Sequence, residues 1–254
     1  MTANEPDRLP TSIGGLIDLA FAVCRERAGL YVGVSLAVVV CCGAFEWLWP
    51  GDSTREIKKT IVVQLADLFT DALAIATVAL GVGGRLAGAD ASSRTLLLAG
   101  IDRWLPALGA MTLAQFVVAF TGPLGAIDTP RNDPTTWLAT PLVWLLWGAL
   151  SLAPPMAVLS TDRPALAIIT GFARALMNAL RVVNLGRLCI VAFVTIIPFL
   201  LQSLLFDTLL ARHVAHAWFW ANIPIDALTV VPLGALQATF ALDFARRVEA
   251  TKRP

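Results

Sequence analysis

Carboxyl and amide side chains interrupt stretches of this sequence that are otherwise apolar, and three of them share one face of a predicted helix. Gln64, Asp67 and Asp71 are three and four residues apart within the apolar stretch Thr60–Val82, a spacing that places them on the same side of an α-helix. Polar side chains in hydrocarbon are costly and usually face a bundle interior or a wet cavity. An acidic path of this kind could admit a proton, a cation or a cationic solute. The predicted polar path comprises Gln64, Asp67, Asp71, Gln115 and Gln237.

Basic side chains follow a second helical pattern in the stretch Ala165–Val183. Arg174, Asn178 and Arg181 are four and three residues apart, so they line one face of a helix whose other positions are mostly apolar. Basic residues at a membrane surface gain about 1 kcal/mol each near an anionic leaflet. With Arg187 they form a predicted contact surface for anionic lipid or a partner protein.

Two histidines provide a third candidate site. His213 and His216 are three residues apart, a spacing that could hold a metal ion or a haem-type macrocycle. Further ligands would have to come from carboxylates such as Asp207 or from a partner chain. The alternative is an interfacial helix in which Trp218 and Trp220 belong to an aromatic belt.

The elements that carry these residues are predicted to cross a membrane. Mean hydropathy is +0.73, and each apolar stretch of about 20 residues is long enough to cross roughly 30 Å of hydrocarbon as a helix. The stretches lack the alternation of barrel strands, so helices are the spanning elements. We therefore expect an all-α, polytopic bundle. Its six predicted transmembrane helices are Leu30–Trp49, Thr60–Val82, Leu105–Ile127, Trp137–Leu159, Leu185–Phe206 and Ile223–Leu242.

The positive charges predict the orientation of these spans. Fourteen of the 19 Lys and Arg residues lie on the side shared by both termini, and short loops rich in Lys and Arg stay cytoplasmic. We expect a multi-pass protein of the cell inner (plasma) membrane with both termini in the cytoplasm. The expected organisation is a flexible tail over 1–10, a membrane domain over 11–249 and a C-terminal tail over 250–254.

Three short amphipathic segments precede the first, third and fifth spans. They are Ile13–Arg27, Ser92–Trp104 and Ala165–Val183, and each opens with residues typical of a helix start. We expect them to form three cytoplasmic interfacial helices. In the fourth span, Pro154 and Pro155 can kink or break the helix, and broken helices often mark binding sites in transporters.

Three stretches together resemble a known membrane domain. They are GGLIDLAFAVCRERAGLYVGVSLAVV, FARALMNALRVVNLGRLCIVAF and PLGALQATFALDFARRVEA. Their order resembles the six-helix membrane domain of membrane-anchored glycerophosphodiester phosphodiesterases and of related bacterial membrane proteins of unassigned function. In the two-part members the attached soluble barrel is catalytic, and we expect that barrel to be absent here. The resemblance implies a membrane module that works alone or with separate partners.

The motifs that the sequence lacks limit the classes of function that we expect. The sequence has no nucleophile elbow, P-loop, zinc-protease motif or dinucleotide-binding turn. We therefore expect that the protein is not an enzyme and that it holds no cofactor or metal. No basic stripe interleaved with aromatic residues indicates nucleic-acid binding. The leading expectation is a membrane module that binds lipids or a partner protein. The alternatives are a transporter, or transporter subunit, for a small solute, lipid or ion, and an accessory subunit of a pigment or haem complex.

Overall fold

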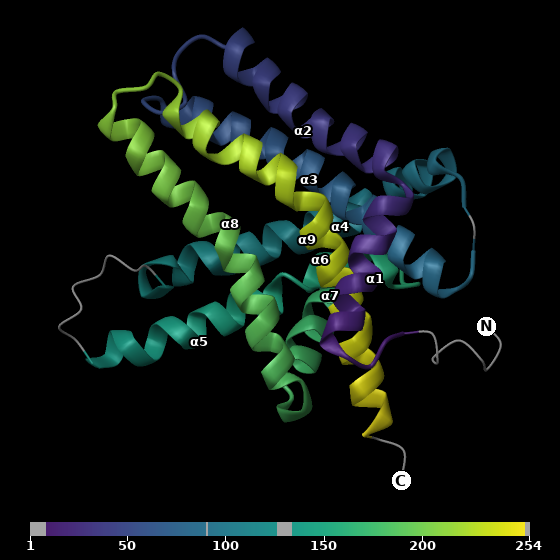
Figure 1. The fold of residues 1–254 in the computed structure, drawn as a ribbon. Coiled ribbons are helices and arrows are strands. Elements are labelled where there is room, and N and C mark those ends of the chain that lie inside the picture. Colours follow the sequence, from purple (N-terminus) through teal and green to yellow (C-terminus); the bar gives the residue numbers. More distant parts are fainter. Residues whose placement is uncertain (1–8, 90, 126–133, 252–254) are drawn as a thin grey trace.

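The protein is a bundle of helices. A computed structural model describes residues 9–89, 91–125 and 134–251, and all regular elements within these ranges are helical (Figure 1). The helices are α1 (Ile13–Glu26), α2 (Ala28–Leu48), α3 (Ile57–Leu86), α4 (Ser93–Gly125), α5 (Pro134–Leu150), α6 (Ala153–Leu159), α7 (Pro164–Ala179), α8 (Leu185–Ala211) and α9 (Ala217–Ala250), with a 3-10 turn, η2, at Val182–Asn184.

Six helical segments within the described ranges are long and apolar enough to cross a membrane. Four of them are provided by α2, α3, α4 and α9, one by η2 with α8, and one by α5 with α6. Large apolar side chains such as Val32, Leu36 and Val40 point outward from α2 and are more than half exposed, as expected of a surface that faces lipid. The prediction of an all-helical chain with six such segments is confirmed.

The fourth segment is broken within its length. Helix α5 ends at Leu150, Ser151 and Leu152 form a turn, and α6 begins at Ala153. Pro154 and Pro155 occupy the first turn of α6, where the missing amide hydrogens remove no intrahelical hydrogen bond. The two prolines predicted from sequence to break this span therefore follow a real interruption.

One of the three predicted entry helices is not a separate element. Segments 13–26 and 164–179 form α1 and α7, but Ser92–Trp104 continues into the third span as the first part of the 33-residue helix α4. A glycine, Gly100, brings this part of α4 close to Thr77 of α3, and the close packing supports an uninterrupted helix. The location of α1 and α7 at a membrane surface stays a prediction.

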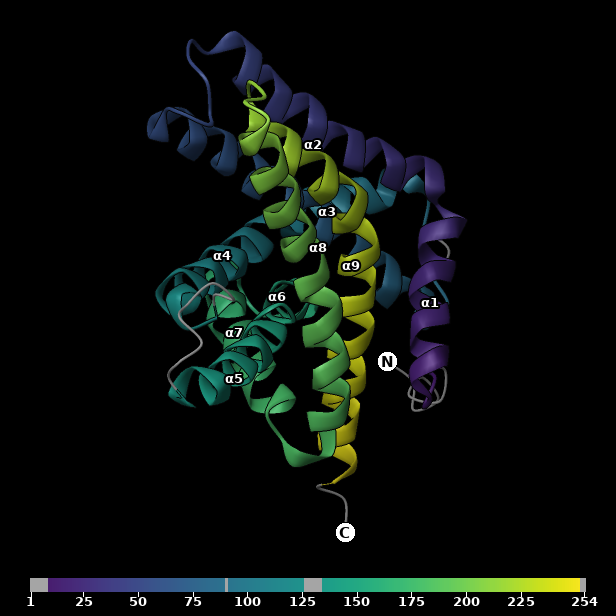
Figure 2. The same ribbon diagram turned by 60° about the vertical axis from the view of Figure 1, so that its left-hand side comes forward.

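Small residues let the central helices approach one another closely. Helix α3 buries alanines at 72, 74, 76 and 79 together with Gly81, and small residues of this kind are typical of helix contacts in membranes. Helices α3 and α9 pack together along this alanine-rich segment of α3, and α8 runs beside α9 (Figures 1 and 2). The core of the bundle therefore lies around α3 and α9, which also carry the acidic residues of the candidate site.

Candidate functional site

Two adjoining cavities open among α3, α4, α8 and α9. The central cavity has a volume of about 320 Å³ and extends to α5 and α6, whereas the loop-side cavity, about 430 Å³, lies closer to the first residues of α3 and α9. Their linings share six residues, so the two spaces meet within the bundle. The shared residues are Asp71, Met111, Gln115, Phe199, Gln202 and Asp226.

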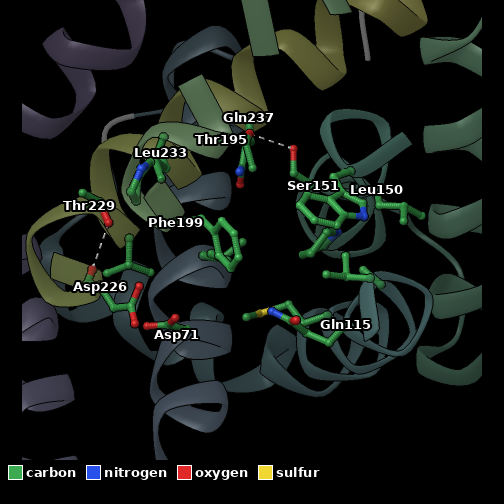
Figure 3. Close-up of a pocket in the computed structure, with 18 of the residues that line it drawn as sticks. Asp71, Gln115, Leu150, Ser151, Thr195, Phe199, Asp226, Thr229, Leu233 and Gln237 are labelled. Carbon is green, nitrogen blue, oxygen red and sulfur yellow. Dashed lines mark hydrogen bonds between the residues drawn. The ribbon is translucent and has the colours of Figure 1, made fainter. Parts of the chain in front are cut away.

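Three carboxyl groups line these spaces. Asp67 and Asp71 come from one face of α3, and Asp226 comes from α9. Figure 3 shows the side chains of Asp71 and Asp226 next to each other on one wall of the central cavity, with Gln115 on another. Asp71 lies fourteen residues into the 30-residue helix α3, or about 21 Å at 1.5 Å per residue. The acidic cluster therefore lies near the middle of its span.

Hydrogen bonding leaves part of this cluster free. The Gln202 amide donates to Asp226 Oδ1 at 2.5 Å, and the Cys42 thiol lies 3.9 Å from Asp67 Oδ1. Asp71 Oδ1 is buried and has no hydrogen-bond partner among the described residues. A buried acceptor without a donor is costly unless a ligand, a proton or water satisfies it. Asp71 therefore presents an acceptor for which the described residues supply no donor.

The ionisable side chains described in the two cavity linings are all acidic. Among the residues that the structure describes, neither lining contains a lysine, an arginine or a histidine. A cavity lined by carboxyl groups within low-dielectric walls focuses a negative potential. When these carboxyl groups are ionised, the space favours a positively charged occupant and opposes the entry of an anion.

The remaining walls of the central cavity are apolar and aromatic. The rings of Trp147 and Phe199 pack edge to face with centroids 6.0 Å apart, and Met111 adds a thioether. Aromatic faces attract cations that have lost part of their water shell. These side chains suit an occupant that combines positive charge with an apolar body.

The break in the fourth span forms part of the same cavity. Leu150, Ser151 and Pro154 line it from this segment. The Ser151 hydroxyl accepts a hydrogen bond from Thr195 of α8 at 3.4 Å (Figure 3). It donates to the Gly148 carbonyl at 2.8 Å. Irregular backbone at membrane depth is tolerated where it is buried in protein or lines a cavity. The interruption therefore coincides with the candidate site.

The structure brings the predicted polar path together along these two spaces. Gln64 and Asp67 line the loop-side cavity, Gln237 lines the central cavity, and Asp71 and Gln115 line both. Sequence reasoning left Asp226 and Gln202 out of the path. The available signal was their position within apolar stretches, but only the fold shows that both side chains turn toward Asp71.

Comparison with known proteins finds no match. No protein-family model, no curated protein and no solved structure matches the chain. The resemblance to the membrane domain of glycerophosphodiester phosphodiesterases stays a prediction, and the cavities themselves provide the basis for a function.

The four residues predicted to contact lipid or a partner fall into two places. Arg174 and Asn178 lie on α7, and Arg181 follows it as an exposed residue. Arg187 is half-buried in α8, where it donates to Asp243 of α9 at 2.6 Å. The Arg187 guanidinium therefore serves a contact within the bundle, because tertiary packing brings a buried carboxylate to it.

An acidic residue at the start of α7 interacts with this arginine set. Asp162 accepts hydrogen bonds from Ser160 and Thr170, and its carboxylate lies 3.8 Å from Arg174. These hydrogen bonds, followed by the nearby Arg174 charge, lower the pKa of Asp162 below its ordinary value. Asp162 thus stays ionised at neutral pH and helps hold the loop between α6 and α7.

The two histidines differ in their surroundings. His213 is exposed, whereas His216 contacts Glu46 of α2 and lies 3.9 Å from Asp52 Oδ1. Of these two histidines, only His216 belongs to a group of potential metal ligands in the described ranges. Asp207, which the sequence offered as a further ligand, is an exposed residue of α8 outside that group.

Proposed function

We propose that this chain is a multi-pass membrane protein that binds a small organic cation in the central cavity and carries it across the membrane, alone or as a transporter subunit. One observation carries the proposal. Three carboxyl groups line two joined cavities within the spanning segments, and no basic side chain of the described part of the chain lines either cavity. We infer a non-enzymatic role, with both termini in the cytoplasm, so that the loop-side cavity faces outward.

The side chains that line the central cavity indicate the chemical class of its ligand. Asp71 supplies an unpartnered acceptor, and Asp226 is held beside it by Gln202. Trp147 and Phe199 provide aromatic surface of the kind that binds ammonium groups. The volume of about 320 Å³ is at the lower end of ordinary ligand pockets. A compact aliphatic or aromatic amine fits this combination of size and charge.

Transport, beyond simple binding, is supported by the helix break. The turn between α5 and α6 lies beside the cavity, and discontinuous helices often form substrate sites near the midplane in transporters. The loop-side cavity supplies a polar route from one end of the bundle to that site. A change at the α5–α6 turn would open or close the other end.

Charge movement in proteoliposomes tests the proposal. On a solid-supported membrane, additions of tetramethylammonium and small primary amines should give a saturable current with the wild-type protein. Asp71→Asn keeps the size of the side chain and removes its charge, so we expect the apparent affinity or current to fall at least tenfold.

Asp207→Asn is the matched control, because Asp207 is an exposed carboxylate of α8 that lines neither cavity. Size-exclusion chromatography verifies that both variants fold. An undiminished current in Asp71→Asn, or an equal loss in Asp207→Asn, would contradict a role for the acidic cavity.

A second function is favoured by the surface of α7. Ile169 and Met177 are more than 60% exposed, and the exposed Arg174 and Arg181 lie near them. Basic residues beside exposed apolar ones are typical of helices that lie on an anionic membrane. We therefore also propose that this end of the bundle contacts anionic lipid or a partner protein, as a module of a larger envelope complex.

The two functions respond to different substitutions. A lipid or partner contact should be lost in the double variant Arg174→Gln/Arg181→Gln and kept in Asp71→Asn. Native mass spectrometry of protein released from membranes in mild detergent measures the retained lipid or partner. Equal retention by the double variant and the wild type would remove the second function.

A further inference from the structure

A second group of ionisable side chains lies outside both cavities, where the last turn of α2 meets the start of α9. Glu46 is in that last turn and its side chain is fully buried. Asp52 lies in the loop between α2 and α3, and His216 immediately precedes α9. None of the three lines either cavity. Packing among three elements therefore brings these residues together from positions 170 residues apart.

The geometry of this group suits a metal ion. One ligand atom from each of Glu46, Asp52 and His216 lies within 4.8 Å of the others. His216 Nδ1 contacts Glu46 Oε1 and is 3.9 Å from Asp52 Oδ1. Bonds of about 2.0–2.2 Å to nitrogen and oxygen place the ligand atoms of a tetrahedral ion roughly 3–4 Å apart. Asp52 Oδ1 is already at that separation from His216 Nδ1, and a side-chain rotation that moves His216 away from Glu46 would bring His216 Nδ1 and Glu46 Oε1 to it.

An independent observation points to a missing ligand. Glu46 Oε2 is buried and has no hydrogen-bond partner among the described residues, although Oε1 of the same carboxylate is well occupied. A bare carboxylate oxygen in the interior carries a large desolvation cost. A cation bound by both oxygens of this carboxylate would satisfy Oε2.

We propose that Glu46, Asp52 and His216 form a binding site for a divalent transition-metal ion such as Zn²⁺. One imidazole nitrogen and two carboxylate oxygens are ligands that Zn²⁺ accepts, and three protein ligands leave a fourth position for water or another donor. This site is independent of the proposed transport function. It also differs from a site built on both histidines, because His213 contributes nothing to it.

Neighbouring groups hold the ligands in place. The Ser53 hydroxyl donates to Glu46 Oε1 at 2.9 Å, and the Thr54 amide donates to Asp52 Oδ1 at 2.9 Å. The ring of Trp47 packs on the His216 imidazole with centroids 4.4 Å apart. Such contacts orient metal ligands and raise affinity.

Basic side chains also lie beside these carboxylates, and the buried one is Lys59. Lys59 Nζ donates to the carbonyls of Glu46, Trp49 and Gly51 and lies 3.8 Å from Glu46 Oε1. Lys59 faces Glu46, while Asp52 is paired with Arg55, whose side chain is 81% exposed and lies 3.9 Å from Asp52 Oδ2, so a bound cation would take the place of Arg55 beside Asp52. A bound ion would fasten α2, its following loop and the start of α9 to one another beside Trp218, which lines the loop-side cavity.

Metal loading of the purified full chain tests this site. The protein is stripped with EDTA in detergent, dialysed against Zn²⁺ and analysed by elemental mass spectrometry, with Co²⁺ absorption spectra to report the ligands. We expect one ion per chain in the wild type and at least tenfold weaker binding in His216→Ala. His213→Ala is the matched control, because His213 lies in the same turn with the same left-handed backbone, φ 54° against 56°, and should bind as the wild type does.

A second variant keeps the test decisive if His216→Ala fails to fold. Asp52 is a loop residue whose side chain is 20% exposed, so Asp52→Asn should fold and should weaken Zn²⁺ binding. The wild type and His213→Ala should also melt at a higher temperature with Zn²⁺, by linkage of binding to folding, and His216→Ala should not. Failure of the wild type to retain Zn²⁺, or equal retention by His216→Ala or Asp52→Asn, would overturn the site whatever the transport assay shows.

Discussion

At the residue scale, Lys59 shows how a charged side chain can serve the helix that precedes it. The last carbonyl groups of any helix lack partners within that helix, and Lys59 Nζ donates to carbonyls at the end of α2 and in the loop after it. Lys59 is 1% exposed, and the buried Glu46 provides a nearby opposite charge. Gly51, at φ 101°, allows the loop to turn beneath this amine.

Replacing Lys59 with methionine should destabilise the bundle. Methionine keeps much of the length of the side chain but leaves three carbonyls without a donor and Glu46 without its cation. Breaking a buried ion pair in this way costs about 3–5 kcal/mol. Thermal unfolding in detergent, followed by tryptophan fluorescence, should therefore show a clearly lower midpoint. Lys58→Met is the control, because Lys58 is exposed on the same helix, and equal midpoints for the two variants would contradict the role of Lys59.

The sequence predicted single residues well where a local period determined their placement. Gln64, Asp67 and Asp71 share a face because of helical spacing alone, and they do line one side of the cavities. Pairings across the bundle carried no such signal. From the sequence, Lys59 and Arg187 were both expected to be loop or surface charges. In the structure, Lys59 faces the buried Glu46 of α2, and Arg187 faces the buried Asp243 of α9.

At the element scale, apolar length predicted the helices, while the connections depended on packing. The six spanning segments follow from runs of about 20 apolar residues. The continuity of α4 and the interruption between α5 and α6 depend on which neighbour each segment meets. Gly100 against α3 and the two prolines of α6 were visible in the sequence, but their effect is determined by the contact.

The contact between α5 and α8 depends on a glycine. A methyl group at Gly148 would lie 2.7 Å from the Cα atom of Ala192, so Gly148→Ala must push the two helices apart. Overpacking of this kind typically costs about 1–3 kcal/mol, and here it would also widen the central cavity, which Leu150 lines. The unfolding midpoint in detergent measures the cost.

Gly33→Ala is the control for this substitution. A methyl group at Gly33 meets nothing within 4 Å, and alanine favours a helix over glycine by about 1 kcal/mol. We therefore expect the control to unfold at the same temperature as the wild type or slightly above it. A midpoint for Gly148→Ala that matches Gly33→Ala would show that α5 and α8 separate without cost.

At the scale of the whole molecule, one buried aspartate joins distant parts of the chain. Asp243 of α9 accepts from Arg187 at 2.6 Å, from Arg246 at 2.7 Å and from Arg247 at 2.9 Å. The same arginines donate to backbone carbonyls of Leu9, Pro10 and Thr11. The sequence assigned 1–10 to a flexible tail, but Leu9 is buried in the core and is held there with Pro10.

Asp243→Asn should release this N-terminal segment. The substitution keeps the shape of the side chain but leaves three guanidinium groups without their carboxylate, so they would repel one another and turn toward water. The carbonyls of residues 9–11 would lose their donors, and α1 would lose its anchor to α9. Hydrogen–deuterium exchange should then rise over residues 9–20, while α3 stays protected. Glu249→Gln removes an exposed acid from the same helix and should leave exchange unchanged. If Asp243→Asn exchanges as the control does, packing of Leu9 and Leu16 alone holds the segment, and the arginine cluster has no part in closing this end of the bundle.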